Sequence, residues 1–290
     1  MSQPMQAVLF LHGRGPKPAA DALRQQWLES VPTLKAVDSE GRLPVGMVYW
    51  ADVAQEIEPR REDVDWVAGH LVGRAFLEVD GKPGLGHDDS AGPNIGRGSA
   101  ESLVYDLANY FREDPALREA VRTRVREAIQ HVAEHVDNIL LIAHELGGVV
   151  AYEVLTHRRY MPGGGEFIDL GDATRAKVSL VTMGTPLGWV YDAELTGYVR
   201  RSSKTYPRAL QSWLNVFDER DPMATPPFMA DPTLADEYST FEHNAEDHQV
   251  ENGALMPNSV YGYLATEPVS GRIEAFLDAS GLVPTSSSST

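Results

Sequence analysis

The chain has 290 residues, of which 42% are hydrophobic and 23% are charged, a balance typical of a folded globular protein. Its 42 acidic side chains outnumber its 25 Lys and Arg side chains. The resulting formal net charge of −17 disfavours binding to nucleic acid or to an anionic membrane surface. The absence of cysteine excludes a disulfide framework, a zinc–thiolate site and a cysteine nucleophile.

Short apolar segments alternate with amphipathic segments along most of the chain. Predicted strands cover residues 7–11, 45–50, 139–143, 178–183 and 213–217, and predicted helices cover 19–31, 116–136, 147–157 and 269–280. The helix over 116–136 is the clearest, because apolar residues form one stripe along it and Arg and Glu fill the other face. This alternation predicts an α/β fold with a mostly parallel sheet and helices on both faces.

Two zones interrupt the alternation. Residues 78–99 are rich in Gly, Pro and Asp and predict a long loop, and residues 191–210 with 222–251 form a second irregular zone. We expect a single domain over residues 1–283, followed by a disordered Ser-rich tail over 284–290. No apolar segment approaches the roughly 18 residues of a membrane span, and no targeting segment is recognisable, so we expect a cytoplasmic protein.

The most informative segment is residues 139–152, Ile-Leu-Leu-Ile-Ala-His-Glu-Leu-Gly-Gly-Val-Val-Ala-Tyr. In it, a predicted buried strand runs directly into a helix through a tight turn that has Glu145 at its apex. The pattern is typical of a nucleophile elbow, in which a strained turn lifts one side chain above the edge of a sheet. Such a turn also directs the helix N-terminus and its backbone N–H groups toward that side chain.

With four further segments, this elbow resembles the α/β-hydrolase fold over essentially the whole chain. It is especially similar to bacterial lipase- and esterase-like members whose elbow reads Ala-His-Ser-Leu-Gly. The further segments occur in the family's order: Phe-Leu-His-Gly-Arg at 10–14, Met-Gly-Thr-Pro-Leu-Gly at 183–188, Trp-Leu-Asn-Val-Phe-Asp-Glu-Arg-Asp-Pro-Met-Ala at 213–224, and Pro-Asn-Ser-Val-Tyr-Gly-Tyr-Leu at 257–264. The resemblance implies an α/β-hydrolase domain with a sheet of about eight strands.

The same resemblance implies an oxyanion loop after the first strand. His12 would shape this loop. The backbone N–H of Gly13 or Arg14 would act with that of Leu146 as the pair of oxyanion donors. These donors belong to the main chain and do not depend on the residue at the elbow.

The departures from the family pattern set this chain apart. Glu145 stands where the family has serine, and Asn258 stands in the segment that normally supplies the catalytic histidine. The expected acid is retained, as Asp221 or, second, Asp218. A Ser-His-Asp mechanism needs a hydroxyl to attack and an imidazole to move its proton, so this chain is not a conventional serine hydrolase.

Several functions remain open for Glu145. It resembles the elbow aspartate of haloalkane dehalogenases and epoxide hydrolases, which attacks carbon, although it is one methylene longer. Alternatively, it acts as a general acid or base, either on a small ester, lactone or epoxide or in a lyase, isomerase or cyclase-like reaction, with Asp221 orienting Asn258. The competing hypothesis is a catalytically inactive pseudo-hydrolase that binds a small ligand or a protein partner through the same pocket; an artificial replacement of the serine is a third.

The remaining histidines predict no further site. His144 is expected to pack beneath the elbow. His243 and His248 lie in an acidic stretch that favours a solvated loop over a metal site or a substitute base. Because the spacing of these histidines fits no established ligand pattern, we expect no metal. No Gly-x-Gly-x-x-Gly follows the first strand, so we expect no nucleotide cofactor. The expected partner is a small molecule, and the oligomeric state is not predicted.

Overall fold

The computed structural model describes residues 5–13, 17–55, 110, 116–156, 176–187, 210–221, 224, 245–253 and 256–282. Within them, six strands form one sheet: β1 Gln6–Leu11, β2 Val45–Val48, β3 Asn138–His144, β4 Lys177–Met183, β5 Leu210–Phe217 and β6 Ala245–Gln249. The order across the sheet is β2-β1-β3-β4-β5-β6, and every neighbouring pair is parallel. An α/β fold with a parallel sheet is therefore confirmed; the described residues supply six of the roughly eight expected strands.

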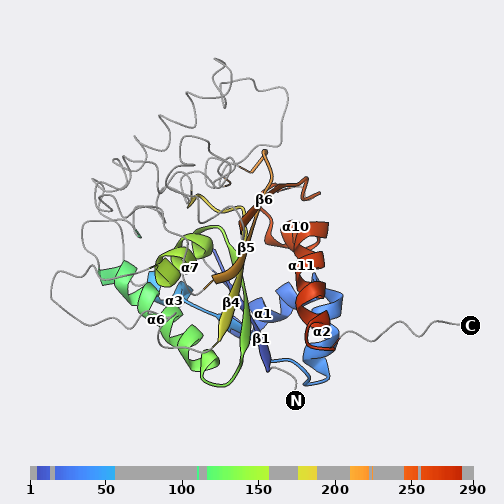
Figure 1. Ribbon diagram of the computed structural model, residues 1–290. Coiled ribbons are helices and arrows are strands. Elements are labelled where there is room, and N and C mark those ends of the chain that lie inside the picture. The colour runs from blue at the N-terminus through green and yellow to red at the C-terminus, as the bar shows by residue number, and fades with distance from the viewer. Residues whose placement is uncertain are drawn as a thin grey trace, which may run out of the picture.

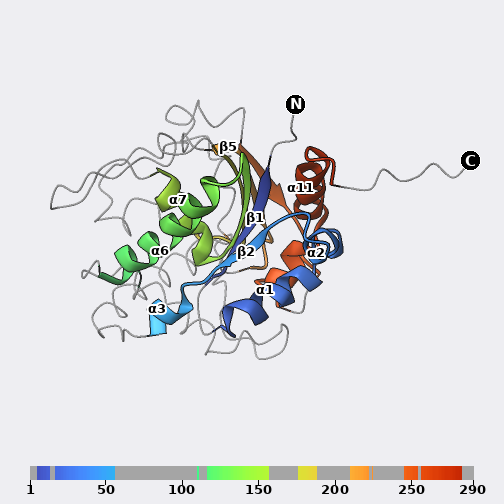
Figure 2. The same ribbon diagram turned by 90° about the horizontal axis from the view of Figure 1, so that it is seen from below.

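Helices cover both faces of the sheet (Figures 1 and 2). One face carries α3 Ala51–Gln55, α6 Ala116–Ala133 and α7 Leu146–Thr156. The other carries α1 Ala20–Glu29, α2 Pro32–Ser39, α10 Val260–Leu264 and α11 Glu267–Asp278. None of these described helices combines the length and the apolarity that crossing a bilayer requires.

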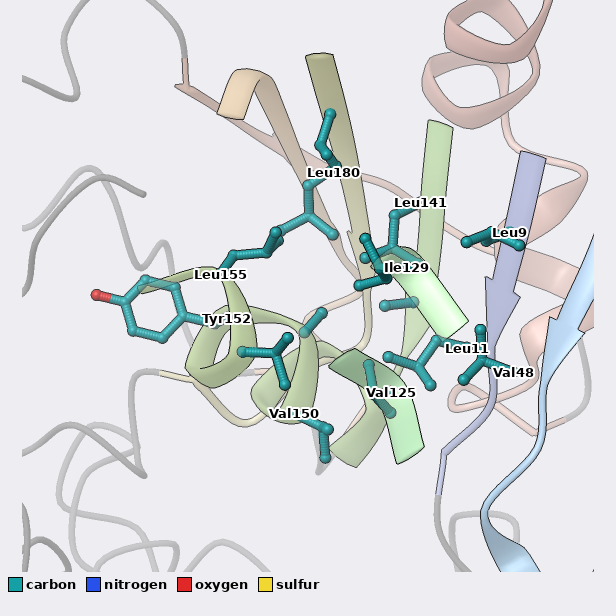
Figure 3. Packing of buried hydrophobic residues seen from close by; sticks show 14 of the residues in the cluster. Leu9, Leu11, Val48, Val125, Ile129, Leu141, Val150, Tyr152, Leu155 and Leu180 are labelled. Atoms are coloured by element: carbon teal, nitrogen blue, oxygen red, sulfur yellow. The ribbon is translucent and has the colours of Figure 1, made fainter. Parts of the chain in front are cut away.

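The strands are buried on both faces because their alternate side chains enter two separate cores. In β1, Leu9 and Leu11 pack toward α6 and α7, whereas Val8 and Phe10 pack toward α1 and α11. Figure 3 shows the first core, where Leu141 of β3 lies near Ile129 of α6. The apolar runs that predicted strands are thus explained by burial on two sides.

A buried ion cluster ties α7 to α6. The carboxylate of Glu153 in α7 accepts hydrogen bonds from Arg118, from Arg122 at 2.9 Å and from the hydroxyl of Tyr110 at 2.5 Å. Burial alone would raise the pKa of Glu153, but the two guanidinium groups outweigh it and hold the pKa at about 2. The cluster fixes the helix that begins at the predicted elbow.

The prediction of a loop around His248 was wrong, because residues 245–249 form β6, the outermost strand of the described part of the sheet. This strand reads Ala-Glu-Asp-His-Gln and has no apolar alternation to reveal it. Its main chain pairs with β5, and Asn215 of β5 donates to Asp247 at 2.7 Å. Charged side chains are common on edge strands because they prevent pairing with another chain.

Some predicted features lie outside the described residues. They are Arg14, His243, the loop over 78–99, residues 191–209, 222–223 and 225–244 of the second irregular zone, and the tail over 284–290. Three of the described helices, α2, α3 and α10, were not predicted. Pro32 lies in the first turn of α2, where its missing N–H costs nothing.

Candidate active site

The candidate site lies where the strand order reverses. The chain places β2 on one side of β1 and β3 on the other, so the connections after β1 and β3 leave the sheet toward opposite faces. In such sheets, ligands bind beyond the carboxyl ends of the strands at this switch point. His12 and Gly13 follow β1 there, and Glu145 follows β3.

Glu145 occupies a left-handed backbone conformation between β3 and α7. Its φ is +49°, and it is the non-glycine residue with positive φ in the described part of the chain. Its N–H donates to the Met183 carbonyl at 3.0 Å, and its own carbonyl accepts from the Gly148 N–H and the Thr185 hydroxyl, each at 3.0 Å. A left-handed residue with a side chain costs about 1–2 kcal/mol. The tight, strained turn predicted from the sequence is therefore present, and these hydrogen bonds hold it.

Small residues let the turn pack against the end of β1. A methyl group at Gly147 would lie 2.5 Å from the carbonyl oxygen of His12 and 2.7 Å from that of Leu11. A methyl group at Gly13 would lie 2.5 Å from Oε2 of Glu145. The missing side chain of Gly13 thus provides the space that the Glu145 carboxylate fills.

The Glu145 side chain is buried, with 5% of the residue exposed. Its Oε1 accepts a hydrogen bond of 3.4 Å from the side-chain amide of Asn258, and its Oε2 lies over Gly13. Leu146 is the first residue of α7, so its N–H belongs to the positive end of the helix beside this carboxylate. The structure thus brings together Glu145, Asn258, Gly13 and Leu146.

A short chain of hydrogen bonds fixes Asn258. The side-chain amide of Asn252 donates to the carbonyl of Pro257, and the backbone N–H of Asn252 donates to Asp218 at 2.9 Å. Ser259 then caps α10, because its hydroxyl accepts from the N–H of Gly262 at 3.5 Å. Asn258 is therefore held between an anchored loop and the start of a helix.

The two candidate acids have different partners. Asp218 accepts hydrogen bonds from the Arg220 guanidinium, 3.0 Å to Oδ1 and 2.7 Å to Oδ2. Burial alone would raise the pKa of Asp218, but the hydrogen bonds from Arg220 and from the Asn252 N–H outweigh it and lower the pKa. Asp221 accepts a hydrogen bond of 2.7 Å from the hydroxyl of Tyr263. Among the described residues, the hydrogen bond of Asn258 goes to Glu145 and not to Asp221.

Tyr263 is a residue of this region that sequence reasoning did not single out. Its hydroxyl accepts from the backbone N–H of Asp218 at 3.0 Å and donates to Asp221. Burial, together with the Asp221 charge, raises the pKa of Tyr263, so the hydroxyl keeps its proton and remains a donor. Tyr263 lies in the 257–264 segment. Its hydroxyl group within an otherwise apolar helix is the feature of the sequence that could have identified it.

The histidines near the strand ends have structural partners. The Nδ1–H of His12 donates to the Gly13 carbonyl at 2.7 Å, and its Nε2 accepts from the Trp50 N–H at 3.0 Å. Burial lowers the pKa of His12 to about 4, so the ring is neutral at pH 7. His144 packs against Trp27 and Tyr263. His248 is exposed on β6, 3.2 Å from Glu246.

The described residues also include one group able to hold a metal ion, formed by His131, Glu134 and His135. It spans the last turn of α6 and the turn that follows, just before β3 begins. Glu145 stands at the other end of β3. The group is therefore separate from the candidate active site.

The chain matches no known family model and no curated protein. Among solved structures, it is similar to Thermogutta terrifontis esterase 2 phosphoramylated by tabun. The two chains are 14% identical, and the match has a TM-score of 0.40 and covers 97% of this chain and 85% of the esterase.

Proposed function

We propose that this protein is an α/β-hydrolase-like enzyme that hydrolyses a small ester, lactone or epoxide, with Glu145 as general base and then general acid. One observation carries the proposal. The buried carboxylate of Glu145 is held on a left-handed turn at the switch point of the sheet, with Asn258 donating to it. Backbone strain at a functional position of the fold indicates a role in function, since strain is costly to maintain.

The strand order and the turn support the assignment to this fold class. The chain passes from β3 into α7 through a single left-handed residue, as the sequence resemblance to a nucleophile elbow implies. The first turn of α7 offers backbone N–H groups beside the carboxylate. A fold alone does not fix a reaction, so the reaction is argued from Glu145 and its neighbours.

The neighbours favour proton transfer over covalent catalysis. An ester formed on Glu145 would need a second base to activate water, and imidazole is the usual choice. His12 uses both ring nitrogens for backbone partners, and its lowered pKa of about 4 comes from burial. Among the described residues, Asn258 donates to the carboxylate, and its neutral amide does not accept a proton.

The proposed reaction balances without another group. The ionised Glu145 removes a proton from water while the water oxygen bonds to the acyl carbon, or to an epoxide carbon. The N–H groups of the first turn of α7 and the amide of Asn258 stabilise the negative charge that develops on the substrate oxygen. With an ester or lactone, the protonated Glu145 then gives its proton to the leaving oxygen as the C–O bond breaks. With an epoxide, the ring C–O bond breaks as the water oxygen bonds to carbon, and the protonated Glu145 gives its proton to the resulting alkoxide. The products are an acid and an alcohol, a hydroxy acid or a diol, and Glu145 returns to its ionised form.

A pseudo-hydrolase is the second candidate, and one observation favours it. The Glu145 carboxylate lies over Gly13, one of the residues expected to supply an oxyanion donor, so the side chain fills part of the expected substrate position. A protein of this kind would bind a small ligand or a protein partner beside Glu145 without converting it. The proposed enzyme would turn over a substrate, whereas the pseudo-hydrolase would not.

The test compares three forms of the protein on a panel of esters, lactones, epoxides and haloalkanes. They are the wild type, Glu145→Gln and Glu274→Gln, the last removing an exposed carboxylate on α11 as a matched control. We expect Glu145→Gln to lower kcat/KM at least about 100-fold, the scale of general base catalysis, and Glu274→Gln to leave it unchanged. Thermal unfolding of each variant confirms the fold.

Two outcomes contradict the proposal. Turnover that survives in Glu145→Gln places the reacting group elsewhere. No turnover of any substrate by a folded wild type favours the pseudo-hydrolase.

A further inference from the structure

Three residues with metal-binding side chains gather at the end of α6. His131 lies in the last turn of the helix, and Glu134 and His135 follow in the turn that leads to β3. One candidate ligand atom from each side chain lies within 4.8 Å of the others, and all three side chains are exposed. A histidine pair four positions apart puts both rings on one side of a helix end.

The orientation of His135 is fixed by a backbone carbonyl. Its Nδ1 lies 2.8 Å from the carbonyl oxygen of His131. A carbonyl oxygen only accepts, so Nδ1 carries the hydrogen and Nε2 keeps its lone pair. Histidine ligands in metal sites commonly donate their second ring N–H to a carbonyl in this way, which orients the ring and selects the tautomer. The His131 and His135 ring centroids are 5.3 Å apart.

We propose that His131 and His135, each through a ring nitrogen, and Glu134, through a carboxylate oxygen, bind one divalent transition-metal ion of the Zn²⁺ type. Two imidazoles and one carboxylate suit this class, whereas Mg²⁺ prefers oxygen ligands alone. Zn–N and Zn–O bonds of about 2.0–2.2 Å bring tetrahedral ligand atoms to about 3.4 Å from one another. The exposed side chains of His131 and Glu134 close the present spacing by rotating toward His135, and water completes the coordination.

The site is independent of the proposed catalytic function. It precedes the first residue of β3, Asn138, whereas Glu145 follows the last, His144. Six steps of extended chain, at about 3.3 Å each, separate the two ends by about 20 Å. Bound metal there would not touch the reacting groups.

Metal binding would fasten the connection between α6 and the sheet. Asp137 follows His135 closely, and its carboxylate accepts from the N–H of Met5 at 2.9 Å, just before β1 begins. An ion that joins the last turn of α6 to the following turn restrains this connection. Because the unfolded chain does not hold the three ligands together, binding stabilises the folded form.

The test is calorimetric titration of the untagged full-length chain with Zn²⁺, and with Mg²⁺ for comparison. We expect one Zn²⁺ ion per chain and no measurable Mg²⁺ binding. His131→Ala and His135→Ala should each weaken Zn²⁺ binding at least tenfold, and Glu134→Gln should weaken it less. The matched control is His248→Ala, which removes an exposed histidine on β6 and should bind Zn²⁺ like the wild type.

Thermal unfolding provides a second readout. Saturating Zn²⁺ should raise the Tm of the wild type by about 5 °C, and a chelator should reverse the rise. Without Zn²⁺, His131→Ala and His135→Ala should have the same Tm as the wild type, which would show that they fold. Addition of Zn²⁺ should not raise their Tm. Wild-type binding in His131→Ala and His135→Ala, an equal loss in His248→Ala, or no binding by the wild type would overturn the proposal.

Discussion

The side-chain amide of Asn258 donates to Oε1 of Glu145 at 3.4 Å, joining two residues that are 113 positions apart in the chain. The contact brings the turn after β3 against the loop before α10. Under the proposed function, these two positions correspond to the serine and the histidine of a conventional hydrolase. Here they hold a carboxylate and its amide donor, and the proposed chemistry follows from that exchange.

Removing the amide should weaken catalysis more than stability. Asn258→Ala deletes one charge-assisted hydrogen bond. Because this bond is 3.4 Å long, its removal should raise the activation free energy by only about 1 kcal/mol. We expect kcat/KM to fall about fivefold to tenfold, with little change in Tm. Steady-state kinetics on the best substrate of the panel measures it, and unchanged kinetics would show that Asn258 does not assist Glu145.

Two helical glycines should respond in opposite ways to alanine. A methyl group at Gly147 meets the backbone carbonyls of Leu11 and His12, neither of which can rotate away, so Gly147→Ala should cost about 3 kcal/mol. The nearest atom to a methyl group at Gly271 is 3.7 Å away, so Gly271→Ala should stabilise α11 by about 0.5–1 kcal/mol. Urea unfolding measures both. Equal changes in the free energy of unfolding for the two variants would mean that β1 and α7 are not in close contact.

The backbone at residue 145 should favour glycine over alanine. Both Glu145→Gly and Glu145→Ala remove the carboxylate, but only glycine accepts a φ of +49° without a steric cost. We expect the glycine variant to be more stable than the alanine variant by about 1 kcal/mol, the reverse of the order found inside helices. Denaturant unfolding of the pair measures this difference. Greater stability of the alanine variant would rule out a left-handed turn.

Stability should fall as the pH drops below 6.5, because His12 must gain a proton when the chain unfolds. Burial lowers its pKa from 6.5 to about 4 in the folded state, so between these values the unfolded state binds more protons. This contribution is fully present above pH 6.5, and about 3 kcal/mol is lost as the pH falls to 4. Unfolding measured from pH 7.5 to 4 should show this slope, and His12→Asn should flatten it. If His12→Asn showed the same dependence of stability on pH as the wild type, the loss of stability at low pH would come from other groups.

The sequence predicted the parts of the fold that depend on local pattern. The apolar run before Glu145 and the glycines after it were sufficient to predict the strand, the turn and the helix. The edge strand β6 was missed because pairing with β5, and not burial of its polar residues, makes it a strand. Strand pairing of that kind leaves little trace in a local pattern.

The details of the site depend on contacts between distant residues. Whether Asp218 or Asp221 is the retained acid was left open. The structure joins Asp218 to Arg220 and Asp221 to Tyr263, and the hydroxyl of Tyr263 links the two aspartates. Tyr263 lies more than 40 residues from both of its partners. No periodicity or spacing in the sequence reports such a contact.

The most direct test of Glu145 as a general base is a single turnover with excess enzyme in H₂¹⁸O, using an epoxide substrate, because attack by a carboxylate on an epoxide carbon would give an alkyl ester on Glu145. General base catalysis adds water oxygen to the substrate, so the first turnover should place one ¹⁸O atom in the product and none in Glu145. Covalent catalysis instead transfers an unlabelled oxygen from Glu145 to the product, and the carboxylate then takes up ¹⁸O from water. Mass spectrometry of the product and of the peptide that contains Glu145 distinguishes the two. Label in the product alone is the predicted result, and label in Glu145 would contradict it.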